Sequence, residues 1–260
     1  MAKKTSTRFP PIVLACLSLA FLVAGWLMSS FPVLILAALA PLFAITDQSL
    51  ESKNPWNGLE LIWIILTAGL LAAWQFDFSH LITGFIQAIG LTLAFGSYIW
   101  VGRTLGPRIG KWVIILFWLA LEYLLIKSPW RTDLILLADA FQLKPSWLKW
   151  DASLGFTAVT LWILISNWLF YVAIFRSSIN LLALVAFILV ASLPPIVSVL
   201  SLSSVPITRD IMETAYQGGT GPDVYMAKGE LVARSALWIM ALVLMFTGVK
   251  AVTQKEKKKK

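Results

Sequence analysis

Long runs of apolar residues, separated by short polar turns, follow one another from Phe9 to Phe246. A helix that crosses a hydrocarbon core of about 30 Å needs about 20 mostly apolar residues. The pattern therefore predicts an all-α, polytopic transmembrane helix bundle of about eight helices in one domain, residues 1–260. The predicted helices cover residues 11–27, 31–46, 59–74, 81–101, 112–126, 154–175, 179–200 and 236–252.

Two longer polar segments interrupt the helices, at residues 127–153 and 202–234. The first mixes charged residues with tryptophans and contains one short apolar stretch, Leu134–Ala138. This stretch is too short to cross a bilayer, so we expect an amphipathic segment on the membrane surface. The second segment is expected to be a loop with a glycine-rich turn at Gly218–Gly221.

An even number of crossings places both termini on the same side of the membrane. If that side is cytoplasmic, the cytoplasmic segments carry 14 Lys and Arg residues and the outer segments carry 7. Cytoplasmic segments of membrane proteins are enriched in Lys and Arg. We therefore predict that both termini are cytoplasmic and that both long segments face outward.

Composition fits a membrane protein, with 59% hydrophobic and 13% charged residues. Much of the net charge of +8 comes from a C-terminal run, Lys255 and Lys257–Lys260. A basic run next to a bilayer is typical of a tail beside anionic lipid, so we expect no nucleic-acid partner. Cys16 is the single cysteine and lies within the first predicted helix, which excludes an intrachain disulfide.

Glu122 is the one carboxylate well inside a predicted span, where an ionisable group costs about 2.5–3.5 kcal/mol on insertion scales. It either anchors a lipid or substrate in a cleft or bonds to another helix, with Asn167 and Gln87 as candidate partners. The same two interpretations apply to Asn167. The only histidine, His80, has no further ligands at metal-binding spacing. The sequence thus predicts no catalytic residue, metal site or cofactor.

Four stretches match the order and spacing of a known family: Pro32–Phe43 with its Ala-Pro-Leu motif, Trp118–Trp130, Pro145–Asn167 and Tyr225–Glu230. Through them the chain resembles the membrane domain of the bacterial apolipoprotein N-acyltransferases. The resemblance implies a multi-pass protein of the bacterial inner membrane. Members of this family move an acyl chain from phospholipid to the N-terminal cysteine of lipoproteins.

In that family, a periplasmic nitrilase-like domain between helices seven and eight supplies the catalytic Glu, Lys and Cys. This chain has only Leu202–Arg234 there, without a cysteine, so it lacks the acyl-enzyme nucleophile. The resemblance therefore implies a scaffold, a regulator or the membrane half of a split enzyme. The implied partners are membrane phospholipid and a periplasmic nitrilase-like protein or lipoprotein. The candidate lipid- or partner-binding residues are Glu122, Trp130, Trp150, Asp151, Asn167, Tyr225 and Glu230.

Two other function classes stay open. A small transporter or channel needs polar residues that converge at the midplane or broken helices in inverted repeats. Gln87, Glu122, Asn167 and Pro194-Pro195 meet part of that requirement, without an internal repeat. A membrane enzyme would use the loop carboxylates Asp133, Asp139 and Asp151. Since these alternate with Lys and Arg, a solvated amphipathic face also explains them.

Overall fold

The computed structural model describes residues 9–28, 32–54, 56, 58–128, 133–176, 178–200 and 231–257. The regular elements of these residues are helices, as predicted. The α-helices are α1 (Pro11–Leu27), α2 (Ile35–Ala38), α3 (Ala40–Glu51), α4 (Leu59–Ala73), α5 (Leu81–Leu105), α6 (Pro107–Ile126), α7 (Thr157–Phe170), α8 (Leu181–Leu200) and α11 (Leu231–Lys257). Short 3-10 turns lie at Pro32–Leu34, Phe78–His80, Leu137–Phe141, Pro145–Trp147 and Lys149–Ser153, and α7 continues into a π-helical turn, Tyr171–Phe175.

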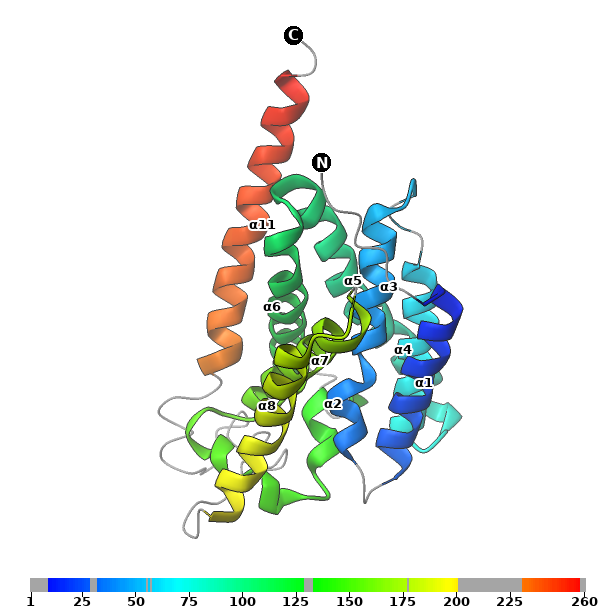
Figure 1. The fold of residues 1–260 in the computed structure, drawn as a ribbon, viewed down its shortest axis with the longest axis vertical. Coiled ribbons are helices and arrows are strands. Elements are labelled where there is room, and N and C mark those ends of the chain that lie inside the picture. Colours follow the sequence, from blue (N-terminus) through cyan, green and yellow to red (C-terminus); the bar gives the residue numbers. More distant parts are fainter. Residues whose placement is uncertain are drawn as a thin grey trace.

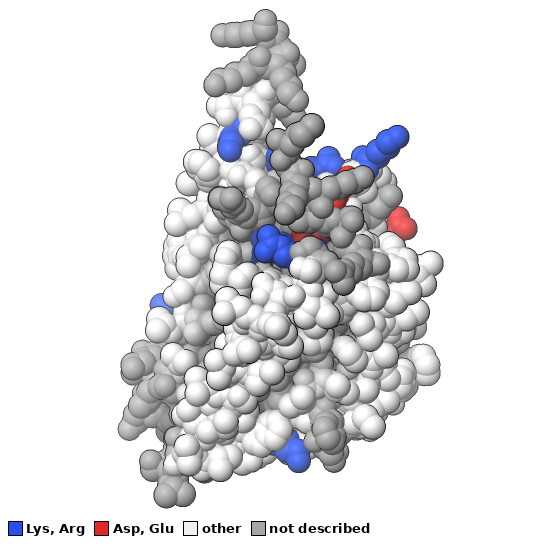
Figure 2. Space-filling view, in the orientation of Figure 1, with Lys and Arg blue, Asp and Glu red and all other residues white. Residues whose placement is uncertain are grey.

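Five helical stretches are long and apolar enough to cross a membrane: Pro32–Glu51, Phe78–Leu105, Thr157–Phe175, Leu181–Leu200 and Leu231–Gln254. Large apolar side chains on α8 and α11 face outward, with Leu182 84% and Trp238 73% exposed. On the face in Figure 2, charged side chains are few and most gather toward the upper end, which leaves a broad uncharged band. Such a surface is suited to lipid rather than water, and indicates a membrane protein.

α4 packs against α5 and α7 against α8, which are neighbours along the chain, whereas α11 packs mainly against α6 and α1 against α4 (Figure 1). The most extensive helix contact joins α5 and α6, which form a hairpin. The turn of this hairpin is Gly106 with φ +107°, a backbone conformation that favours glycine. α7 lies in the interior, where it packs against α2, α3, α6 and α8. α8 and α11 lie at the edge of the bundle (Figure 1). The buried core therefore surrounds α7.

Helix boundaries differ from the prediction where polar residues continue a helix. α3 extends to Glu51 rather than ending at residue 46, and α6 begins at Pro107 rather than residue 112. α11 covers Leu231–Lys257 rather than 236–252. Hydropathy marks only the apolar part of a helix, whereas Ala, Glu and Lys extend it readily into polar surroundings.

The prediction that Leu134–Ala138 lies on the membrane surface is wrong. Leu134, Leu136 and Ala138 are buried, and so are Phe141 and Leu148 further along the segment. Residues 133–153 fold as short 3-10 turns and an irregular stretch, so their apolar side chains do not follow a helical period. They pack against α7 and α8 as part of the core.

The expected single helix over residues 31–46 is broken at Leu39, where the side chain of Asn167 forms hydrogen bonds with the backbone. Ile35 C=O and Leu39 N–H, four residues apart, would bond in a continuous helix. Instead Asn167 Nδ2 donates to Ile35 O (2.8 Å), and Asn167 Oδ1 accepts from Leu39 N (2.6 Å) and Ala40 N (3.1 Å). Pro41 contributes to the break because it lacks the N–H that Ala37 C=O would accept. Asn167 thereby satisfies backbone groups that an apolar interior otherwise leaves unpaired.

α7 makes a similar contact to α8. Pro194 lacks the N–H that Val190 C=O would accept within the helix. The indole Nε1 of Trp162 on α7 donates to Val190 O at 2.7 Å. α8 consequently remains one helix, Leu181–Leu200, with two prolines inside it.

We expect Asn167→Leu to lower the free energy of unfolding by about 2–4 kcal/mol, because two backbone N–H groups and one C=O lose their partner in a buried site. Ser166→Ala is the matched control, since the neighbouring Ser166 hydroxyl donates only to Trp162 O of its own helix (2.8 Å). Thermal or denaturant unfolding in detergent measures both. Equal stability of the two variants would contradict the role given to Asn167.

Candidate functional site

Glu122 lies on α6 with its carboxylate fully engaged. The residue is 2% exposed. Oε1 accepts hydrogen bonds from Trp118 Nε1 (3.0 Å) and Leu137 N (2.9 Å), and Oε2 accepts from Thr160 Oγ1 (2.7 Å). Asn167 and Gln87, the partners considered from the sequence, make no hydrogen bond to it among the described residues. Glu122 does connect helices, but through Thr160 on α7 and a backbone N–H.

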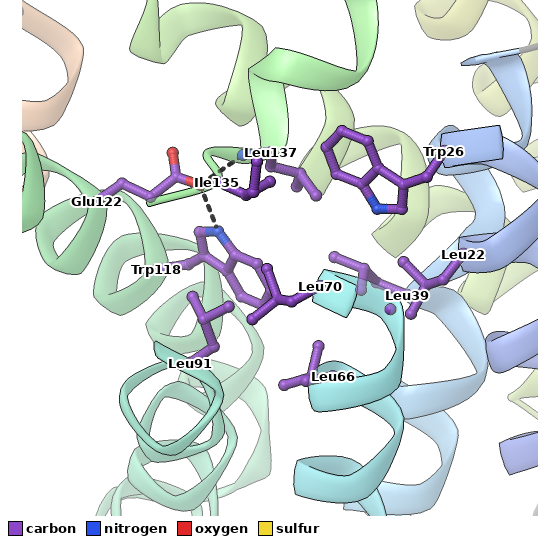
Figure 3. A pocket seen from close by; sticks show the side chains of 11 residues that line it. Leu22, Trp26, Leu39, Leu66, Leu70, Leu91, Trp118, Glu122, Ile135 and Leu137 are labelled. Atoms are coloured by element: carbon purple, nitrogen blue, oxygen red, sulfur yellow. Dashed lines mark hydrogen bonds between the residues drawn. The ribbon is translucent and has the colours of Figure 1, made fainter. Parts of the chain in front are cut away.

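A small apolar pocket lies beside Glu122, and we call it the inner pocket (Figure 3). It has space for little more than one water molecule, about 20 Å³. Trp118 and Leu137, which bond to Glu122, are part of its wall. The other lining residues are Leu22, Trp26, Leu39, Leu66, Gly69, Leu70, Leu91 and Ile135. In this state the pocket is too small for an organic ligand.

The residues Asp133–Leu137, which we call the strap, cross between the start of α5 and the end of α6. Gln87 on α5 holds the backbone of Ile135 on both sides: Oε1 accepts from Ile135 N (3.3 Å), and Nε2 donates to Ile135 O. Glu122 on α6 accepts from Leu137 N. Asp139 Oδ2 accepts from Leu136 N at 2.7 Å. Side chains thus supply hydrogen bonds that a helix would have provided.

On the other side of the strap an open groove of about 250 Å³ lies between α5 and α6. We call it the lateral groove. Its lining residues are Thr83, Ile86, Gln87, Gly90, Leu121, Leu125, Asp133 and Leu134. Ile82 and Ile89, next to it on α5, are exposed apolar residues of the kind that face lipid. The groove is therefore open and mostly apolar, with Thr83, Gln87 and Asp133 as its polar lining residues.

A second buried polar cluster joins four elements at the opposite end of the bundle. Asp47 Oδ2 on α3 forms an ion pair with Lys111 Nζ on α6 (3.0 Å). The hydroxyls of Tyr98 and Tyr171 both donate to the Asp47 carboxylate, and Lys111 Nζ also lies 3.0 Å from Tyr171 Oη. Sequence reasoning missed this cluster, since it assigned Asp47 and Lys111 to separate turns. The two residues are 64 positions apart, and no local pattern pairs them.

The remaining predicted site residues are scattered. Trp150 is half-buried; its backbone N donates to Ser198 Oγ (3.3 Å), and its ring lies edge-on to Trp162. Asp151 is 0% exposed, so the expectation of a solvated face is wrong for this residue, although Asp133 is exposed. The packing of residues 133–153 into the bundle explains its burial. Trp130, Tyr225 and Glu230 lie outside the described residues.

Within the described ranges, no group of three or more His, Cys, Asp or Glu residues gathers in a way that would hold a metal ion. Comparison of the chain with family models, with curated proteins and with solved structures finds no match. The resemblance to apolipoprotein N-acyltransferases therefore stays a prediction, and the geometry must carry the functional argument.

Glu122→Gln should change stability by less than about 1 kcal/mol, because the amide oxygen still accepts from Trp118 and Leu137 and the Thr160 hydroxyl can rotate to accept. Glu122→Leu removes every acceptor and should cost about 2–4 kcal/mol. Unfolding of both variants in detergent measures the difference. A large loss in Glu122→Gln would mean that the negative charge itself is needed.

Lys111→Met should destabilise the protein by about 3 kcal/mol, because it leaves the Asp47 carboxylate buried without its cation. In the double variant Asp47→Asn/Lys111→Met the charge is gone and the tyrosine hydroxyls keep an acceptor, so we expect it to be more stable than Lys111→Met alone. A double-mutant cycle of unfolding free energies measures the coupling. Additive effects would show that the ion pair contributes nothing.

Proposed function

We propose that this chain is a non-catalytic membrane protein that holds an acyl chain of a phospholipid or lipoprotein in the lateral groove. In this role it serves as a scaffold, a regulator or the membrane half of a split acyl-transfer enzyme. The observation that carries the proposal is the groove itself, an open apolar channel between two helices of a membrane protein. Lipid is the ligand present at highest concentration at such a site.

The chemistry of the groove supports an acyl chain rather than a polar solute. Ile86, Leu121, Leu125 and Leu134 give it an apolar body, and Asp133 adds an exposed carboxylate. Gln87 also lines the groove, but it is buried and its amide bonds to the backbone of Ile135. A hydrocarbon chain fits the body of the groove. The ester and headgroup of a lipid need polar groups nearby, and Thr83 and Asp133 line the same groove.

Two buried carboxylates, Glu122 and Asp47, have structural partners on both oxygens. Glu122 accepts hydrogen bonds from three donors, and Asp47 accepts from two tyrosines and pairs with Lys111. Of the three buried carboxylates in the described part of the chain, Asp47, Glu122 and Asp151, Glu122 and Asp47 use both oxygens to join helices, which supports a binding or scaffold role.

The arrangement across the membrane is part of the proposal. With eight crossings and cytoplasmic termini in a bacterial inner membrane, the lateral groove opens into the outer leaflet. A periplasmic nitrilase-like protein or a lipoprotein would then reach a lipid held there. Both partners follow from the sequence resemblance, and a pull-down from native membranes in mild detergent tests for them.

Thr83→Trp should fill the groove and reduce lipid occupancy severalfold, because Thr83 lines it. Ile82→Trp is the control, since the adjacent Ile82 is exposed and does not line the groove. The measurement is photo-cross-linking in proteoliposomes with a phospholipid that carries a diazirine in mid-chain, followed by peptide mapping. We expect preferential labelling of groove residues, lost only in Thr83→Trp. Uniform labelling of all lipid-facing helices would refute the proposed function.

A further inference from the structure

The inner pocket and the lateral groove lie on two sides of the same wall. Along the strap, Leu134 lines the groove and the next residue, Ile135, lines the inner pocket. The same alternation occurs on α5 with Gly90 and Leu91, and on α6 with Leu121 and Glu122 (Figure 3 shows the inner side). The wall consists of α5, α6 and the strap, which lies between the start of α5 and the end of α6.

Below the strap the wall is tight. A Cβ on Gly90 would lie 3.2 Å from Leu121 Cδ2, so α5 and α6 approach each other closely at that level. Beyond the level of Gly90 and Leu121, the non-helical strap residues Leu134–Leu136 fill the space between α5 and α6. Any passage between the two spaces therefore runs through the position of the strap.

The strap can leave this position without breaking α5 or α6. Its backbone is attached to the two helices by hydrogen bonds to two side chains, Gln87 and Glu122. If it moves, Glu122 loses Leu137 N but keeps Trp118 and Thr160 as donors. Ile135 and Leu137, which line the inner pocket, would withdraw with the strap and enlarge the pocket.

We propose that the inner pocket is the end chamber of the lipid site, closed here by the strap, and that its ligand is the tail of a single linear acyl chain. This inference rests on the proposed function of the lateral groove. Leucines dominate the lining of the chamber, which suits a hydrocarbon tail. Hydrocarbon gains little on moving from bilayer to protein. The strap's hydrogen bonds therefore keep the closed state dominant until they are released.

The test uses proteoliposomes with a phospholipid whose acyl chain carries the diazirine at its terminal carbon. Leu66 and Leu70 on α4 report on the chamber, because they line it and are only 4% and 7% exposed. Gln87→Leu removes both strap contacts to Ile135, and we expect it to raise labelling of Leu66 and Leu70 severalfold. Thr92→Val is the control: Thr92 is a buried residue of the same helix whose hydroxyl donates to Ala88 O (2.7 Å).

The mid-chain and terminal probes separate the two proposals. Labelled groove residues with unlabelled Leu66 and Leu70 in Gln87→Leu overturn the end chamber and leave the proposed function intact. Unlabelled groove residues with the mid-chain probe overturn both.

A second variant covers the case in which Gln87→Leu does not fold. In Q87C/I135C, with C16S to remove the native thiol, oxidation should fix the strap to α5. The reduced form is expected to label Leu66 and Leu70 severalfold more than the oxidised form. Equal labelling of the two forms overturns the inference.

Discussion

Every polar group in the apolar interior needs a partner inside the protein, and α7 with the π-helical turn that continues it supplies several of these partners. Thr160, Asn167 and Tyr171 are seven and four residues apart, so they share one face of the helix. They bond respectively to Glu122, to the break between α2 and α3, and to Asp47. One stripe of polar side chains therefore connects α7 to α6 and α3, and the packing of the bundle depends on it.

The break at Leu39 shows how a local sequence feature shapes the site. Pro41 weakens the helix, and Asn167 replaces the lost backbone hydrogen bonds with its own amide. Leu39, held at the break, is part of the wall of the inner pocket. A helix without the break would place residues 35–40 differently and change that wall. The amide on α7 thus influences a cavity to which it contributes no side chain.

The sequence identified the helices because apolar runs report on local periodicity, and it singled out Glu122 and Asn167 because polar residues are rare within spans. It did not reveal their partners. Glu122 bonds to the backbone of Leu137, which has no side-chain signature, and Asp47 pairs with Lys111 across 64 positions. It also misplaced Leu134–Ala138, since a short apolar stretch without helical period does not show whether it lies on the surface or fills a gap between helices.

A broken helix in a membrane protein often exposes backbone groups that bind ions, which would favour a transporter. Here Asn167 already occupies those groups, and the charge of Asp47 is balanced by Lys111. Among the described residues no cation pairs with Glu122, and three neutral donors surround it. The side chains of Asn167, Asp47 and Glu122 thus hold helices together. The lateral groove is open, and its mostly apolar lining is what favours the proposed lipid ligand.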